Sequence, residues 1–108
     1  MQKKLILGLT ENIKINGIQV EAKIDTGADK SSICNSLVDK LKLVPTGKMI
    51  LIRSSHGATQ RKIYMADIEL KGKRFSSEFT VIDRAHLNFD VLIGRNILKK
   101  GFLIDPTK

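Results

Sequence analysis

The sequence is poor in cysteine, aromatic residues and long apolar runs, and each shortage excludes a class of protein. Cys34 is the only cysteine, so the chain forms no internal disulfide and nothing in it indicates an oxidising compartment. Aromatic residues make up 5% of the 108 residues and tryptophan is absent, so the core must be mostly aliphatic. The apolar run near the N-terminus, residues 5–9, is too short for a signal sequence or a membrane span. We therefore expect a cytoplasmic protein that does not enter a membrane.

What is present suits one compact, basic domain, which we place at residues 1–108. Apolar residues make up 42% of the chain, and the many isoleucines and valines favour strands. The net charge is +8, which attracts acidic partners, either nucleic acid or an acidic polypeptide. No basic run exceeds two residues and no aromatic residues interrupt the basic ones. This pattern is typical of a solvated basic surface and argues against a nucleic-acid partner.

Short alternating runs separated by turn residues predict an all-β, barrel-like fold. Asn16-Gly17 is the strongest hairpin signal, joining expected strands at 13–15 and 18–24. We expect a turn at Glu11-Asn12 and short helices at 35–43 and 95–100, of which Pro45 and Gly47 end the first. Further strands are expected at 3–9, 48–53, 59–65, 67–70, 75–82, 89–93 and 101–105.

A weak internal repeat suggests that the chain consists of two related halves. Residues 13–17, Ile-Lys-Ile-Asn-Gly, recur as Ile-Glu-Leu-Lys-Gly at 68–72, and an alternating strand follows each copy. In the first half this strand leads to Asp25, whereas the same offset in the second half holds Thr80. Only one half therefore carries a carboxylate at this position.

Residues 22–29 place that carboxylate where an alternating strand gives way to a turn. Gly27 lets the backbone turn, and the small side chains of Thr26 and Ala28 allow another backbone to approach closely. One carboxylate does little for amide hydrolysis, whereas two carboxylates about one water molecule share a proton, so that one is base and the other acid. Because the chain has one such turn, the second Asp25 has to come from a second copy across a two-fold axis.

Two segments resemble the signature motifs of the retropepsin-type aspartic peptidases, the family of the retroviral proteases. The first is Ile-Asp-Thr-Gly-Ala-Asp at 24–29, and the second is Val-Leu-Ile-Gly-Arg-Asn-Ile-Leu at 91–98. The hairpin expected around 48–65 falls where that family has its flap. The resemblance implies a retropepsin-like (acid protease) closed β-barrel with one or two short helices and pseudo-duplicated halves.

Four further segments, at 53–57, 78–84, 91–95 and 102–106, look like the prokaryotic branch labelled "ATP-dependent zinc protease". That branch is associated with glutamate-ligase systems that add acidic tails to proteins. The residues do not support the zinc or ATP parts of the label, because His56, His86 and Cys34 lack ligand spacing and no Gly-x-x-x-x-Gly-Lys-Ser/Thr loop is present. We therefore expect no metal and no cofactor.

The resemblance also implies roles for individual positions. Asp25 would be catalytic, with Thr26 locking two chains together at the dyad and Gly27 and Ala28 supporting the active site. The N- and C-terminal strands would pair across the dimer. Substrate would contact Gly27, Asp29 and a flap tip of Ser54, Ser55, His56 and Gly57, and Asp29 would form a structural ion pair with Arg95.

The sequence therefore predicts a homodimeric aspartic endopeptidase that acts on a peptide or protein substrate. The positive charge suits an acidic, glutamate-rich segment as that substrate. The alternative is a non-catalytic retropepsin-like dimerisation or peptide-binding domain, which predicts binding without turnover. A basic nucleic-acid-binding barrel would instead show steeply salt-dependent binding that is indifferent to Asp25.

Overall fold

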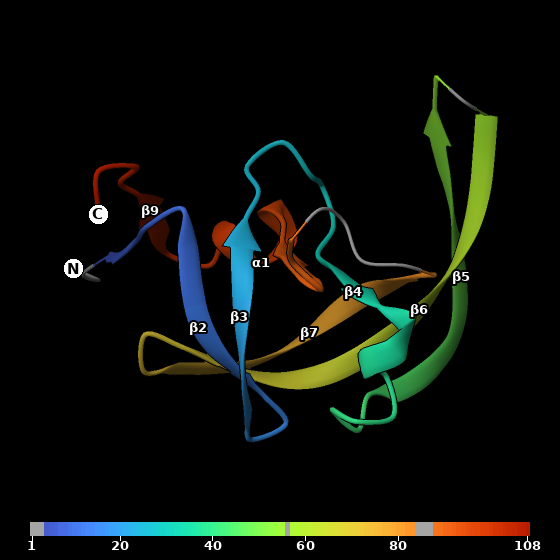
Figure 1. The fold of residues 1–108 in the computed structure, drawn as a ribbon, viewed down its shortest axis with the longest axis horizontal. Helices are drawn as coiled ribbons and strands as arrows, with labels where there is room; N and C mark the ends of the chain where they lie inside the picture. The colour runs from blue at the N-terminus through green and yellow to red at the C-terminus, as the bar shows by residue number, and fades with distance from the viewer. Residues whose placement is uncertain (1–3, 56, 84–87) are drawn as a thin grey trace.

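The computed structural model describes residues 4–55, 57–83 and 88–108, and strands are the main element in them (Figure 1). Alternating, β-branched segments form the strands, and turn residues separate them. The elements are β1 (Leu5–Leu7), β2 (Thr10–Ile15), β3 (Ile18–Ile24), β4 (Ser32–Cys34), the 3₁₀ turn η1 (Asn35–Leu37), β5 (Val44–Ser54), β6 (Gly57–Leu70), β7 (Lys73–Ile82), β8 (Val91–Ile93), the helix α1 (Arg95–Leu98) and β9 (Phe102–Ile104).

Six strands close into a barrel in the order β2-β3-β8-β4-β7-β6, and β5 extends the sheet beyond β6. The barrel closes where β2 pairs antiparallel with β6, with Lys14 opposite Glu69 and Ile15 opposite Ile68. Arg74 donates to the Glu69 carboxylate, and this hydrogen bond holds the Glu69 pKa below its ordinary value. The predicted all-β, retropepsin-like closed barrel with short helices is confirmed.

The core is aliphatic, as the scarcity of aromatic residues predicts. Phe79 is the only fully buried aromatic side chain among the described residues. Burying each large aliphatic side chain contributes about 1.5–3 kcal/mol, so the isoleucines and leucines dominate the stability of the fold. The fully buried aliphatic residues are Leu7, Ile13, Ile15, Ile33, Leu41, Ile68, Leu70, Val91, Ile93 and Ile97.

The two copies of the repeat form equivalent hairpin turns, which lie at opposite ends of the antiparallel β2–β6 pairing. Asn16 and Gly17 have φ of 49° and 83°, and Lys71 and Gly72 have φ of 53° and 80°, so both pairs adopt left-handed backbone conformations. The β2–β6 pairing joins the strands that lead into the two turns. Thr80, the counterpart of Asp25 in the second half, is buried and its backbone N–H donates to Ser31 O at 2.9 Å.

Several predicted boundaries in the first half are wrong. Glu11 and Asn12 do not form a turn, because they lie within β2 and pair with Ala22 and Glu21 of β3. The helix expected at 35–43 is reduced to the η1 turn, which has no side-chain cap, and a sequence of turns follows it. Val38 and Leu41 are nevertheless buried, so the apolar spacing located the inward face without specifying a stable helix.

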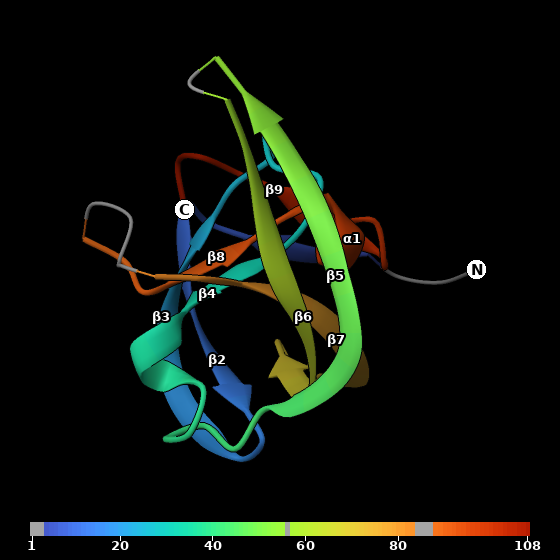
Figure 2. The ribbon, with the colours of Figure 1, turned by 90° about the vertical axis from the view of Figure 1, so that its right-hand side faces the viewer.

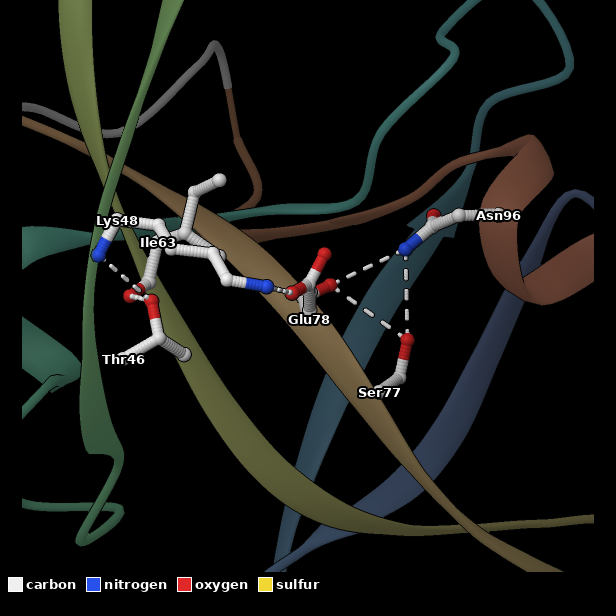
Figure 3. Close-up of polar contacts among 6 residues, drawn as sticks. All are labelled: Thr46, Lys48, Ile63, Ser77, Glu78 and Asn96. Carbon is white, nitrogen blue, oxygen red and sulfur yellow. Dashed lines mark hydrogen bonds and ion pairs between the residues drawn. The ribbon is translucent and has the colours of Figure 1, made fainter.

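Pro45 and Gly47 do not end an element either, since both lie within β5. The β5–β6 register shifts between Pro45 and Met49, and Gly47 has a φ of 79°, which together mark a β-bulge. Thr46 stabilises this bulge, because its hydroxyl donates to Ile63 O at 2.7 Å and accepts from the Lys48 N–H at 3.1 Å (Figure 3). The strands expected at 59–65 and 67–70 are one continuous strand, β6.

The terminal strands β1 and β9 pair with each other in parallel within one chain, with Leu5 opposite Phe102 and Leu7 opposite Ile104 (Figure 1). The two terminal strands are therefore partners within one chain, and their pairing across a dimer stays a prediction. Leu7 and Phe102 are buried, whereas Ile6 and Leu103 remain exposed on the outer side. No helix in the described part of the chain is long and apolar enough to cross a membrane.

Candidate active site

Asp25 lies at the point where β3 leaves the barrel. Its backbone N–H donates to Ile93 O on the neighbouring strand β8 at 2.9 Å, which fixes the end of β3. The backbone then turns, with the Ala28 N–H donating to Asp25 O at 3.3 Å and the Gly27 N–H donating to Asp25 Oδ1 at 3.0 Å. The turn therefore orients the carboxylate, which is only half-buried.

The segment after this turn lies across the start of α1. The Arg95 N–H donates to Ala28 O at 2.8 Å, and the Asn96 N–H donates to Asp29 O at 3.1 Å. A Cβ on Gly94 would lie 2.5 Å from Lys30 O, which no side chain tolerates. The glycine of the second motif is thus needed for close packing of two backbones.

Arg95 connects both sides of the turn. One of its guanidinium nitrogens donates to Thr26 O at 2.7 Å, and another pairs with Asp29 Oδ1. The side chains of Arg95 and Asp29 are 50% and 79% exposed, so solvent screens this ion pair. Its contribution is geometric, since it fixes the turn that carries Asp25.

Sequence reasoning missed two residues that support the site, Ser31 and Asn96. The Ser31 side chain is fully buried, and its hydroxyl donates to Asn96 Oδ1 at 2.8 Å and accepts from the Gly94 N–H at 2.9 Å. Asn96 Nδ2 in turn donates to Glu78 O at 3.1 Å (Figure 3). The one available signal was an amide residue in the otherwise apolar stretch after Gly94-Arg95.

A cleft of about 530 Å³ opens beside Asp25. Asp25, Gly27, Ala28 and Asp29 line its floor, and Ile52, Arg53 and Arg61 of the β5–β6 hairpin line the opposite side. Of the predicted flap-tip residues, Ser54 ends β5, Ser55 lies in the turn, Gly57 begins β6, and His56 lies outside the described residues. The structure thus brings the Asp25 segment together with the hairpin, and neither Ser55 nor Gly57 of the predicted tip lines the cleft.

The cleft is rich in positive charge. Lys23, Lys30, Arg53 and Arg61 line it, and none of them forms an ion pair within the described part of the chain. The two carboxylates on the lining are Asp25 and Asp29, and Asp29 already pairs with Arg95. The cleft therefore favours negatively charged groups.

The described residues hold no group of three histidine, cysteine, aspartate or glutamate side chains that could bind a metal ion. Cys34 is buried, and its sulfur accepts from the Ser36 hydroxyl at 3.3 Å. This arrangement suits a small core residue.

The barrel and the Asp25 turn are those of an aspartyl protease, and the chain belongs to this family. The family model for aspartyl proteases matches residues 12–97, which include the Asp25 turn and the Gly94–Asn96 segment. One curated relative is Protein DDI1 homolog 1 of Caenorhabditis elegans, 32% identical over 94 residues that cover 82% of this chain and 24% of the relative. The chain thus spans about a quarter of that relative's length.

Solved structures share the fold at lower identity. Protein Lpg0085 of Legionella pneumophila, of unknown function, has a TM-score of 0.70 at 18% identity, covering 96% of this chain and 95% of that one. The EIAV protease in complex with the inhibitor HBY-793 has a TM-score of 0.68 at 22% identity, with coverages of 92% and 88%. The simian foamy virus protease has a TM-score of 0.63 at 18% identity, with coverages of 83% and 91%.

Proposed function

We propose that this chain is a homodimeric aspartic endopeptidase in which each subunit supplies one Asp25. A water molecule between the two Asp25 carboxylates would attack the peptide carbonyl. One carboxylate would take the proton of the water while the other, protonated, donates to the carbonyl oxygen. The pair would titrate as a unit.

The observation that carries this proposal is that, of the two carboxylates lining the cleft, Asp29 already has an ion-pair partner and Asp25 has none among the described residues. Asp29 pairs with Arg95, so its carboxylate is already engaged by a partner on the far side of the turn from Asp25. No other carboxylate of the described chain lines the cleft. A second copy of the Asp25 turn would supply the missing group.

An exposed apolar surface near the Asp25 turn supports the dimer. Leu9 is 54% exposed, and its carbonyl accepts from the Ile24 N–H, one residue before Asp25. Ile6 and Leu103 of the paired terminal strands are 39% and 49% exposed. Burying these side chains against a second copy would bring the exposed Thr26 and its equivalent together at the two-fold axis.

The β5–β6 hairpin would act as the flap, with Ile52 and Arg61 above the bound peptide and Ser54, Ser55, His56 and Gly57 at the closing tip. An extended peptide would lie between the hairpin and the floor, where Gly27 and Asp29 would contact its backbone. Closure would exclude water other than the attacking molecule.

The unpaired cations of the cleft support an acidic, glutamate-rich peptide as substrate. Lys23 and Lys30 lie on the floor side and Arg53 and Arg61 on the hairpin, so carboxylates on either face of an extended peptide would find a partner. This substrate also suits the prokaryotic "ATP-dependent zinc protease" branch, to which we assign the chain on its sequence motifs. The single cysteine supports a cytoplasmic location.

The substitution Asp25→Asn tests the mechanism. Cleavage of an acidic peptide should be abolished while the dimer persists by sedimentation, and Asp39→Asn, an exposed carboxylate outside the cleft, should leave both unchanged. Excess Asp25→Asn chain added to wild-type protein should inhibit cleavage, because mixed dimers hold one carboxylate. A chelator should have no effect.

Residual cleavage by the Asp25→Asn protein would overturn the mechanism. If excess Asp25→Asn chain left wild-type cleavage unchanged, the proposal that two subunits share one active site would be overturned. Peptide binding by the wild-type protein without any cleavage would favour the alternative, a non-catalytic peptide-binding domain.

A further inference from the structure

Strand β5 ends the seven-stranded sheet and, among the described residues, pairs with β6 alone. Its other edge therefore presents unpaired backbone N–H and C=O groups along the outside of the hairpin (Figure 2). Such an edge is a template for another strand, and proteins normally protect it with proline, bulges or lysine.

The two halves of this edge differ in protection. Pro45, the bulge at Gly47 and Lys48 guard the first half, where the register of the ladder is broken. From Met49 to Ile52 the strand consists of four apolar residues in unbroken register with β6. The second half is thus an open edge without the usual protection.

The outer face of this open half is apolar. Met49 and Leu51 are 55% and 47% exposed, whereas the alternate residues Ile50 and Ile52 are half-buried. Ile52 lines the cleft, so Met49 and Leu51 point away from it. A segment that covers Met49 and Leu51 would therefore lie outside the substrate cleft.

The charge of the hairpin decides what kind of segment fits. Residues 44–65 contain no aspartate or glutamate and carry Lys48, Arg53, Arg61 and Lys62. Lys48 pairs with Glu78 of β7 at 3.8 Å (Figure 3), but Arg53 and Lys62 form no ion pair within the described residues. Lys62 lies opposite Met49 and therefore shares the outer face with the apolar pair, whereas Arg53 lines the cleft.

The same charge argues against a second copy of this chain at the edge. Two β5 edges brought together would place cations of one hairpin beside cations of the other, with no carboxylate on either strand to compensate. A partner segment that carries carboxylates would instead be attracted by the positive charge of the hairpin.

We propose that the open edge of β5 at Met49–Arg53 binds an extended segment of another protein that combines apolar and acidic residues, as an added strand. Backbone hydrogen bonds would supply affinity, apolar side chains would cover Met49 and Leu51, and a carboxylate would lie near Lys62. The interaction does not depend on peptide cleavage.

The test uses the full chain with Asp25→Asn, which removes turnover, and a short fluorescent peptide of alternating valine and glutamate. We expect binding to weaken about tenfold or more on Leu51→Glu, which places a carboxylate in the apolar surface, and on Lys62→Glu. Val44→Glu is the matched control, because Val44 is an exposed residue of the same strand on the guarded side of the bulge. Lys30→Glu reports binding in the cleft.

Loss of binding on Leu51→Glu and Lys62→Glu, with retention on Val44→Glu and Lys30→Glu, supports the proposal. Loss on Lys30→Glu alone would mean that the peptide occupies only the cleft and would overturn it. Equal binding of a valine–lysine peptide, or of a peptide methylated on alternate backbone nitrogens, would also overturn it. So would a self-association in sedimentation that Leu51→Glu abolishes, because the edge would then hold a second copy.

Discussion

At the scale of single residues, Gly94 and Gly27 belong to the two motifs of the site, but a side chain would be tolerated differently at each. A Cβ on Gly94 would meet backbone atoms of Lys30 and Ala28 within 2.9 Å. A Cβ on Gly27 would meet only Asp25 Oδ1, at an ordinary contact distance of 3.4 Å. Gly94 is therefore a packing requirement of the fold, whereas Gly27 keeps the space beside the carboxylate open.

These two glycines give a paired prediction. Gly94→Ala should lower the free energy of unfolding by about 2–3 kcal/mol, since backbone atoms of the Asp25 segment must move. Gly27→Ala should change it by less than about 1 kcal/mol. Urea denaturation of both variants measures the difference, and equal losses would contradict the packing role of Gly94.

At the scale of elements, the β5–β6 hairpin has a hydrogen-bonded bulge at its base and an end that projects beyond the barrel. The bulge at Gly47 breaks the ladder, and Thr46 replaces the lost contacts with two hydrogen bonds. Beyond the bulge the hairpin extends past the barrel (Figure 2). Ile52 and Arg61 of this hairpin line the cleft. Thr46 thus lies where any hinge motion of the hairpin would begin.

Thr46→Val tests this position, because valine keeps the shape and removes both hydrogen bonds. We expect a loss of about 1 kcal/mol in unfolding free energy. Amide hydrogen exchange should accelerate in residues 48–62 more than in the barrel strands. Thr10→Val, an exposed threonine of β2, is the control, and uniform acceleration across the chain would contradict a local role for Thr46.

At the scale of the whole molecule, the described chain forms half of the proposed site. Its cleft holds Asp25 and an Asp29 already paired with Arg95. Exposed apolar side chains lie on Leu9, whose carbonyl accepts from the Ile24 N–H beside Asp25, and on Ile6 and Leu103 of the terminal strands. The exposed Asp25 turn and this apolar surface together specify which side of the barrel would face a partner subunit.

Glutamate substitutions test whether this apolar surface is the dimer interface. Leu9→Glu and Leu103→Glu should each weaken association about tenfold or more, because burying a leucine contributes about 1.5–3 kcal/mol. Cleavage should fall in parallel at low protein concentration and recover as the concentration rises. Val44→Glu should alter neither, and unchanged sedimentation of the Leu9 and Leu103 variants would place the dimer interface elsewhere.

By itself, the sequence determined the elements whose signals are local. Alternation identified the all-β class, the left-handed turn at Asn16-Gly17 fixed one hairpin, and the repeat at 68–72 located its counterpart. The Asp25 turn and the Gly94-Arg95 segment were recognisable because their spacing is short and their residue types are specific.

Only the tertiary structure decided the rest, because those features depend on contacts between distant residues. Glu11-Asn12 was misassigned since a polar pair reads as a turn until β3 pairs with it, and Pro45 was misassigned since a bulge admits proline into an edge strand. Ser31 gave no recognisable signal and Asn96 only that of an amide in an apolar stretch, because their role arises from burial and a hydrogen bond across 65 residues of chain. The ion pair between Asp29 and Arg95 was expected from the family resemblance alone, and the folded barrel confirms it by bringing the two side chains together.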